Sequence, residues 1–234
     1  MSRWAMPPRG RRTESLSKDA IVAAATEILD ADGETALTFR ALASRLDTGA
    51  GAIYWHVANK DELLAAATAD AVDRTLAGVD DTDDPREALR LIAGRVFDTV
   101  DEHPWVATHL SRGLGQPGMV AVLDAIGRQV DALGVAPDRL FDTATALLSY
   151  VLGGAAQNAA NARRHAQTGE VPSRTAALGQ EADRWAAFDD ERYPFVRAMA
   201  SSLRDHDDRE QFLAGVDLIL AGIDAQDGPA VGRG

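Results

Sequence analysis

The stretch LTFRALASRLDTGAGAIYWHVANKDELL, residues 37–64, decides the fold of the N-terminal part of the chain. Thr38 is a favourable N-cap residue, and the apolar residues that follow it recur at helical spacing. The sequence therefore predicts a short helix that begins at Thr38 and ends at Leu46. The next three residues, Asp47-Thr48-Gly49, are typical of a tight turn, because Asp and Gly tolerate the backbone conformations that turns require.

Helices are predicted on both sides of these elements. A second short helix is expected over 50–56, and Asn59 is placed to cap a longer one over 60–77. Upstream, residues 17–32 carry apolar side chains on one helix face, and Gly33 ends that helix. Two short helices that are joined by a tight turn and supported by a longer preceding helix make a helix-turn-helix.

The sequence Tyr54-Trp55-His56 places three aromatic rings in a row in the second short helix. Successive residues of a helix are separated by about 100°. When Ile53 faces the core of this small domain, most of the aromatic cluster therefore points to solvent. Tyrosine and histidine donate hydrogen bonds to phosphates or base edges, and small residues beside them permit close approach to the major groove. The alternatives are a half-buried core position for Trp55, a solvated surface position for His56 and a helical hairpin without a DNA partner.

The charge of the chain is unevenly distributed. The net charge is −12 at pH 7, but residues 1–60 hold eight Lys or Arg and seven Asp or Glu, whereas the remainder holds sixteen and twenty-nine. Residues 1–12 alone carry a net charge of +4. A basic N-terminal segment on an otherwise acidic chain can still bind a polyanion, because the acidic remainder is repelled and oriented away from it. Arg11 and Arg12 are therefore candidate DNA contacts; the alternative is a disordered tail without a partner.

The composition and the absence of known motifs exclude several classes of protein. The chain has 234 residues and no cysteine, which excludes disulfides and thiolate metal sites and leads us to expect a cytoplasmic protein. No apolar run approaches the roughly 20 residues of a membrane span, and no apolar segment follows the N-terminal arginines, so we expect neither a membrane partner nor a secretory signal. The sequence contains no Glu-x-x-His pair, nucleophile elbow or phosphate loop, and the spacing of His103 and His109 does not suit a shared metal. We therefore expect no enzyme, no cofactor and no metal site.

The remainder of the sequence predicts helices throughout, without an alternating run of strand length. The longest predicted helix opens at Pro137, extends to residue 165 and carries Gly153-Gly154 in its middle. Residues 166–188 hold Gly, Pro, Ser and charged residues, and they predict a long, mobile connection. The expected fold class is all-α. Further helices are expected over 104–112, 190–203 and 207–224.

The segment SKDAIVAAATEILDADGETALTFRALASRLDTGAGAIYWHVANKDELL, residues 17–64, resembles the DNA-binding domain of the TetR family of transcriptional repressors. The resemblance covers about one fifth of the chain. It extends to the tetracycline-repressor branch through Tyr54-Trp55-His56-Val57 followed by Asn59-Lys60. It implies a homodimer in which each subunit presents a recognition helix to one half of a palindromic operator.

Position by position, the resemblance implies a set of DNA contacts. Arg40 would reach a base edge, most often guanine, whereas Thr38 and Lys60 would touch phosphates. Family members often place polar side chains where Ala50 and Ala52 stand, so specificity is expected to depend on Arg40, on the tyrosine of the aromatic cluster and on DNA shape. The full set of expected DNA-binding residues is Arg11, Arg12, Thr38, Arg40, Ala50, Gly51, Ala52, Tyr54, Trp55, His56 and Lys60.

In this family the C-terminal helices form a ligand pocket and the dimer interface, and the sequence gives independent reasons to agree. The last helix carries a second stripe beside its apolar face, made of Gln211, Gly215, Leu218 and Gly222. The core of a monomer does not need both faces, so the second face is available to another subunit. A two-fold four-helix interface is therefore expected; the alternative is packing within the chain. Polar or aromatic side chains on otherwise apolar helices are the candidate ligand contacts, although each is alternatively a core residue: Trp105, His109, Met119, Leu123, Phe141, Tyr150 and Asn158.

The tetracycline-repressor branch uses a histidine and a carboxylate around a ligand-bound magnesium ion. His109 lies near the place of that histidine. The segment GGAAQNAANARRH, residues 153–165, lacks the acid. A tetracycline–magnesium complex is therefore not the expected inducer.

The expected function is that of a ligand-responsive repressor. A homodimer would bind double-stranded operator DNA and be released when a small, largely apolar molecule binds the C-terminal domain, with the helix over 60–77 as the lever. The alternative is a helical small-molecule sensor, or an activator, that does not act by release from an operator. The expected domains are a flexible basic arm over 1–16, a helix-turn-helix domain over 17–62, a helical ligand-binding and dimerisation domain over 63–225 and a flexible tail over 226–234.

Overall fold

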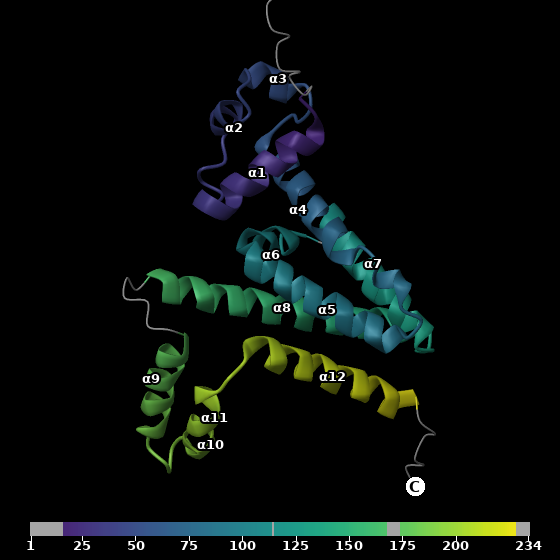
Figure 1. Ribbon diagram of the computed structural model, residues 1–234. Helices are drawn as coiled ribbons and strands as arrows, with labels where there is room; N and C mark the ends of the chain where they lie inside the picture. Colours follow the sequence, from purple (N-terminus) through teal and green to yellow (C-terminus); the bar gives the residue numbers. More distant parts are fainter. Residues whose placement is uncertain (1–15, 114, 168–173, 228–234) are drawn as a thin grey trace, which may run out of the picture. The chain divides into compact units, whose positions relative to one another are not determined.

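The computed structural model of the chain describes residues 16–113, 115–167 and 174–227 (Figure 1). In these residues every regular element is a helix, which confirms the expected all-α class. The chain divides into two compact units, with the division between Ala67 and Thr68. We call the N-terminal unit the head and the C-terminal unit the body, and each is described by itself.

The head contains three helices and the first part of a fourth. The short helices lie close to their predicted positions, but the second of them is two residues shorter at its C-terminal end than the expected 50–56. The helices are α1 (Lys18–Asp32), α2 (Phe39–Arg45), α3 (Ala50–Tyr54) and α4 (Lys60–Leu76), which runs across the division into the body.

Side-chain caps mark where α1, α2 and α4 begin, and the predicted caps at Thr38 and Asn59 are confirmed. The side-chain oxygen of Ser17 accepts a hydrogen bond from a backbone N–H at the start of α1, at 3.1 Å, and Thr38 does the same at the start of α2, also at 3.1 Å. Asn59 accepts a bond from the backbone N–H of Glu62, at 2.8 Å, at the start of α4. Gly33 ends α1 with a φ of 76°, a left-handed conformation that glycine adopts without strain.

The core of the head is small and made of aliphatic side chains. Ile21 of α1, Leu42 of α2 and Ile53 of α3 are fully buried, and Val57 closes the core beyond α3. Asp47, in the turn between α2 and α3, has a φ of 49°, which Asp tolerates better than most residues. The short helices are therefore held by caps, one turn and a few aliphatic contacts.

The body begins with the end of α4. Its longest helix, α8, has 28 residues. The other elements are a short 3-10 helix (Val79–Asp81), α5 (Pro85–Glu102), α6 (Pro104–Leu110), α7 (Pro117–Ala132), α8 (Leu140–Gln167), α9 (Arg174–Ala186), α10 (Pro194–Ala198), α11 (Ala200–Arg204) and α12 (Asp208–Asp227).

Three expectations about the body are wrong. The region 166–188 contains helix α9, because Leu178, Ala182 and Trp185 recur at helical spacing within it. The single helix expected over 190–203 is two short ones, α10 and α11. The longest helix begins at Leu140, three residues after the expected start, because the preceding residues form a turn.

Helix α5 lies at the centre of the body and packs against α7, α8 and α12 (Figure 1). Ion pairs fasten it to α12. Arg209 of α12 donates two hydrogen bonds to the carboxylate of Asp98, at 2.7 and 2.9 Å, and Arg90 pairs with Asp217 at 2.9 Å. The hydrogen bonds that Arg209 donates to Asp98 raise the pKa of Arg209 above its ordinary value. These partners are about half exposed, so each pair contributes only modestly to stability.

Helices α8 and α12 pack closely where two glycines face two aromatic rings. The ring of Tyr150 stacks on that of Phe212, with centroids 5.5 Å apart, and its hydroxyl donates to the backbone carbonyl of Phe212 at 2.9 Å. A methyl group added to Gly215 would overlap the hydroxyl of Tyr150, and one added to Gly154 would lie 2.8 Å from the ring of Phe212. Gly215, which the sequence assigned to an outer stripe, therefore packs within the chain. In contrast, Gly153 has open space around it.

Candidate DNA-binding surface and ligand-sensing helices

The aromatic cluster after the turn lies on the surface of the head. Trp55 is 90% exposed and Tyr54 is 54% exposed, and His56 is exposed as well. The ring of Tyr54 stacks face to face on that of Phe39 from α2, with centroids 4.2 Å apart and planes 5° apart. The stack orients the tyrosine while leaving about half of its surface accessible. The high exposure of Trp55 excludes the alternative of a core position for this residue.

Polar side chains that could meet DNA lie on α2 and around the turn. Arg40 is exposed in the first turn of α2. Thr38 is exposed too, but its hydroxyl oxygen already caps α2 and keeps its own hydrogen available to a phosphate. The ammonium group of Lys60 donates to the backbone carbonyl of Glu34 within the head, and this bond uses one of its three hydrogens.

The residues between the turn and the aromatic cluster are small. Gly51 is exposed, and a methyl group added to it would contact nothing within 4 Å. Ala50 and Ala52 are half-buried. A flat, small-residue strip beside exposed rings permits a close approach of the backbone to another surface. Arg11 and Arg12 lie outside the described residues.

In the body, four of the seven candidate ligand residues lie on α6 and α7. Trp105 and His109 are buried on α6 with their rings in edge contact, 6.3 Å apart. Met119 is buried and Leu123 is half-buried, one turn apart on α7. An indole, an imidazole and a thioether within largely aliphatic surroundings are typical of the lining of an apolar small-molecule site.

The exposure or the contacts of the other three candidate ligand residues do not require a ligand. Phe141 is 67% exposed in the first turn of α8. Burial raises the pKa of Tyr150 above its ordinary value, so the phenol remains neutral and donates its bond to α12. The amide of Asn158 donates to the carboxylate of Asp101 on α5, at 2.9 Å. The structure therefore does not bring the seven residues together.

The first turn of α7 lies at a junction with α4 and α6. A methyl group added to the buried Gly118 would lie 3.2 Å from Cγ2 of Thr68 and 3.3 Å from Cγ2 of Val72, both on α4. It would also lie 3.3 Å from Cδ2 of Leu110 on α6. Helix α7, which carries Met119, is thus packed closely against α4, and the end of α6 lies beside the same glycine.

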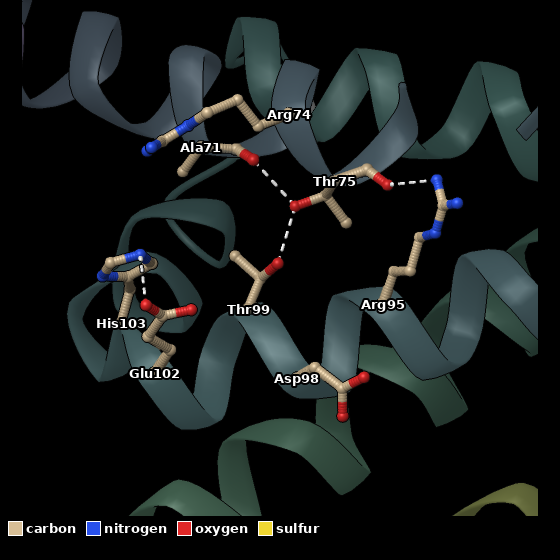
Figure 2. A pocket seen from close by; sticks show the side chains of 8 residues that line it. All are labelled: Ala71, Arg74, Thr75, Arg95, Asp98, Thr99, Glu102 and His103. Atoms are coloured by element: carbon tan, nitrogen blue, oxygen red, sulfur yellow. Dashed lines mark hydrogen bonds and ion pairs between the residues drawn. The ribbon is translucent and has the colours of Figure 1, made fainter. Parts of the chain in front are cut away.

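A second link joins the C-terminal end of α4 to α5 (Figure 2). The hydroxyl of Thr75 donates to the carbonyl of Ala71 and lies 2.7 Å from the hydroxyl of Thr99. Arg95 donates to the carbonyl of Thr75, at 3.3 Å, and to that of Ala77. The last carbonyl groups of a helix have no hydrogen-bond donor within that helix. Arg95 therefore supplies donors to the carbonyl groups at the C-terminal end of α4.

These bonds lie beside a hollow of about 300 Å³ between α4 and α5. None of the seven candidate ligand residues lines it. Its charged groups are engaged, since Arg74 pairs with Asp70 at 3.1 Å and Asp98 pairs with Arg209. The hollow is lined by Ala71, Arg74, Thr75, Arg95, Asp98, Thr99, Glu102 and His103 (Figure 2).

Sequence reasoning missed the residues that connect α4 to the rest of the body. Gly118 has no side chain to indicate a contact, and Thr75, Arg95 and Thr99 are polar residue types that are common on the exposed faces of helices. The only signal in the sequence was a pair of threonines in helix interiors, where threonine is not favoured. That signal is too common to identify a contact between helices.

Two further findings concern the described residues. None of their helices is long and apolar enough to cross a membrane. Among their side chains, no group of three or more His, Asp or Glu is placed to hold a metal ion.

The turn between α2 and α3 and the exposed residues around it define a helix-turn-helix, the motif of many DNA-binding regulators. Comparison with known families agrees. Residues 21–67 match the model of the bacterial regulatory proteins of the tetR family, and residues 77–226 match the tetracyclin repressor-like C-terminal domain. The chain therefore belongs to the TetR family and is a transcriptional regulator.

Two individual relatives are HTH-type transcriptional regulators. Over 152 residues the chain is 31% identical to an HTH-type transcriptional regulator of Saccharopolyspora erythraea, a match that covers 64% of each protein. It is 30% identical to the HTH-type transcriptional repressor DrrR1 of Streptomyces coeruleorubidus, where the match covers 64% of this chain and 56% of DrrR1. The chain thus spans less than two thirds of the length of both relatives.

Solved structures of two Streptomyces coelicolor proteins share the fold. The transcriptional regulator SCO7222, a TetR, is 44% identical, with a TM-score of 0.80 over 90% of this chain and 98% of that one. The TetR family protein ActR in complex with actinorhodin is 24% identical, with a TM-score of 0.72 over 93% of this chain and 100% of ActR. The likeness to ActR shows the fold alone.

Proposed function

We propose that this TetR-family regulator is a repressor that binds a palindromic operator as a homodimer and is released by a small, largely apolar molecule. Residues 17–62 would bind DNA, and residues 63–225 would bind the effector and the second subunit. The observation that carries the proposal is the 90% exposure of Trp55, in a row of aromatic residues whose Tyr54 stacks on Phe39, the residue before Arg40. An apolar ring that is so exposed contributes little to the stability of the head, and it suits a surface that is covered by a partner.

The surface around α3 offers the groups that DNA recognition uses. Arg40 can donate two hydrogen bonds to the O6 and N7 atoms of guanine, the most common specific contact in the major groove. Tyr54 and His56 can donate to phosphates or base edges, and Gly51 allows the backbone to come close. We keep as our proposal for the DNA contacts the full set of residues that the sequence predicted, which begins with Arg11 and ends with Lys60.

The proposed dimer interface uses the outer faces of α8 and α12. On α8, Gly153 is exposed and open, and Phe141 is exposed at the N-terminal end. On α12, Leu218 is 75% exposed, Gln211 is exposed, and Gly222 has open space around it. Two such faces on antiparallel helices can form a two-fold four-helix interface, which would bury residues that a monomer leaves in water.

The proposed effector site lies around α6 and α7, where Trp105, His109 and Met119 are buried. A ligand held there would be largely apolar and would have one polar group for the imidazole of His109. The complex of ActR with actinorhodin is consistent with an effector site in this fold. The repressor name of DrrR1 is consistent with the proposed direction of regulation.

The proposed coupling runs through α4. A ligand that moves α6 or α7 would press on Thr68 and Val72 at the Gly118 junction, while Thr75 and Arg95 hold the end of α4 on α5. Helix α4 would then respond by reorientation of its N-terminal part, which belongs to the head. The ligand must bind one arrangement more tightly than the other, and such couplings are typically about 1–3 kcal/mol.

The substitution Arg40→Ala tests the DNA-binding half of the proposal. We expect it to cost about 1–3 kcal/mol of operator binding and to relax specificity at one base pair, because a bidentate contact to guanine is lost. The measurement is a fluorescence anisotropy titration against the operator and its single-base variants. Arg45→Ala is the matched control on the same helix, because Arg45 is paired with Glu27 at 2.7 Å, and it should leave affinity nearly unchanged. A uniform loss across all DNA sequences would instead assign Arg40 to phosphate.

Two titrations separate the proposed function from its alternatives. Operator affinity should fall steeply with salt concentration, because phosphate contacts release counterions, and a flat salt dependence would favour a sensor that does not bind DNA. An effector found by thermal-shift screening should weaken operator binding. An effector that binds but leaves operator affinity unchanged would contradict release as the mechanism.

A further inference from the structure

Tyr54 is the last residue of α3 and has no large neighbour on its own helix. The residues three and four positions before it, which lie on the same face of a helix, are Gly51 and Ala50. Beyond Tyr54 the chain forms a turn, in which the N–H of His56 donates to the carbonyl of Ile53 at 2.9 Å. A side chain that is 54% exposed at such a position keeps much of its rotational freedom. Helix α3 alone therefore does not fix the direction of this ring.

The ring is fixed instead by Phe39, the first residue of α2. The two rings are nearly parallel, with planes 5° apart and centroids 4.2 Å apart, so one face of the tyrosine lies against the phenylalanine. The same distance is 5.5 Å between Tyr150 and Phe212 in the body, where the rings are also stacked. The contact in the head is therefore the closer of the two, although it joins residues of two different short helices.

Phe39 belongs to a part of the head that is firmly held. Thr38, the residue before it, caps α2 by accepting a hydrogen bond from the N–H of Ala41 at 3.1 Å. Leu42, in the next turn of α2, is fully buried, and α2 packs against both α1 and α3. Phe39 itself is half-buried. The stack therefore joins an exposed ring, which its own helix leaves free, to a helix that is anchored in the core.

An oriented side chain binds a partner at a lower entropic cost than a mobile one. Immobilising one long side chain at an interface weakens affinity by roughly two- to tenfold, and this cost is avoided when folding has already fixed the ring. Arg40 is exposed next to Phe39, in the same turn of α2. The stack thus fixes Tyr54 relative to the helix that carries the proposed contact to guanine.

We propose that Phe39 is a positioning residue for DNA binding, which acts through Tyr54 by holding its ring in the orientation that meets the operator. This inference rests on the proposed function, because that function assigns Tyr54 to DNA. Phe39 is not one of the DNA contacts that the sequence predicts. Its contribution to affinity therefore depends on the presence of the tyrosine ring, and a double-mutant cycle can measure this dependence.

Nuclear magnetic resonance of the tyrosine rings tests the stack directly, because the chain contains only three tyrosines. Selective ring labelling of the full-length protein gives three sets of signals, and Tyr54→Phe identifies the set of Tyr54. The ring current of Phe39 should shift these signals upfield. Phe39→Leu keeps an apolar side chain but removes the flat ring, so it should abolish the shift and leave Tyr150 and Tyr193 unchanged. Tyr54 signals that do not move in Phe39→Leu contradict the inference.

The functional test uses the duplex that the full-length protein enriches from a random pool, at a temperature where every variant is folded by circular dichroism. Phe39→Leu should weaken binding about threefold for each head, and so about tenfold for a dimer whose two heads bind together. In a Tyr54→Ala background the same substitution should change affinity by less than about twofold, because the ring to be positioned is absent. Phe39→Tyr retains the flat ring and should restore affinity to within about twofold of the unsubstituted protein.

The outcomes separate this inference from the proposed function. An equal loss from Phe39→Leu in both backgrounds, or a loss that Phe39→Tyr does not restore, assigns Phe39 to the packing of the head and overturns the inference. Unchanged affinity of Phe39→Leu or of Tyr54→Ala also overturns it, whereas the proposed function stands if Arg40→Ala still weakens binding. Failure of the unsubstituted protein to enrich any duplex overturns the proposed function itself.

Discussion

Tryptophan residues differ in solvent exposure between the head and the body. Trp55 in the head is 90% exposed, whereas Trp105 in the body is 7% exposed. The head is held by caps and a small aliphatic core, and its aromatic cluster contributes little to that core. The core of the body buries the rings of Phe97, Trp105 and Phe212, and Gly154 makes room for the last of these. The difference indicates that the buried rings stabilise the body, whereas Trp55 is available to a partner of the head.

The largest expected effect in this comparison is that of Trp105→Ala. Removal of a buried indole should lower the free energy of unfolding by about 3–5 kcal/mol, because it leaves a cavity beside α6. Chemical denaturation followed by circular dichroism measures the change. A loss below about 1 kcal/mol, the range of exposed positions, would show that Trp105 does not belong to the packed core.

The next effect concerns the close approach of α8 and α12. Gly215→Ala should lower the free energy of unfolding by about 1–3 kcal/mol, because the new methyl group overlaps the Tyr150 hydroxyl. Gly127→Ala is the matched control, since nothing lies within 4 Å of the added group, and it should stabilise helix α7 by up to about 1 kcal/mol. Equal effects of the two substitutions would contradict the packing described for Gly215.

A smaller effect is expected where hydroxyl groups join α4 to α5. Thr99→Val removes the partner of the Thr75 hydroxyl and keeps the side-chain shape, so the free energy of unfolding should fall by about 0.5–1.5 kcal/mol. The effector should also release the operator less completely, because the end of α4 is held less firmly. Ser111→Ala is a control, since the hydroxyl of Ser111 donates within its own segment, to the carbonyl of Ala107. Unchanged release by the effector would show that this bond is not used in the coupling.

The smallest effect on stability is expected for Trp55→Ala. Because the side chain is almost fully exposed, the free energy of unfolding should change by no more than about 0.5 kcal/mol. Operator binding should nevertheless weaken. A large loss of stability without a change in DNA affinity would show that Trp55 stabilises the head and does not bind DNA.

Local chemistry made the head predictable from its sequence. Ser17, Thr38 and Asn59 bond to backbone groups a few residues away, so the signal and the structure that it specifies lie in the same short window. The outward direction of Tyr54 followed from helix geometry, whereas Trp55 and His56 lie in the turn beyond the end of α3. The family could be identified for the same reason.

The body was less predictable because its contacts join residues far apart in the sequence. Tyr150 has the features of a ligand contact until Phe212 and Gly215 are placed beside it. Gly153 and Gly154 are neighbours in the sequence, yet only Gly154 packs against a ring in this chain. Helix α9 was missed because the Gly, Pro and Ser residues before it masked a short helical pattern.

The central claim is that the exposed aromatic face of the head reads a symmetric DNA sequence. Selection of bound duplexes from a random pool by the full-length protein tests it most directly. We expect the enriched sequences to be palindromic and expect Arg40→Ala to degrade one symmetric pair of base positions. Absence of enrichment, or enrichment that Arg40→Ala and Trp55→Ala leave unchanged, would contradict the claim.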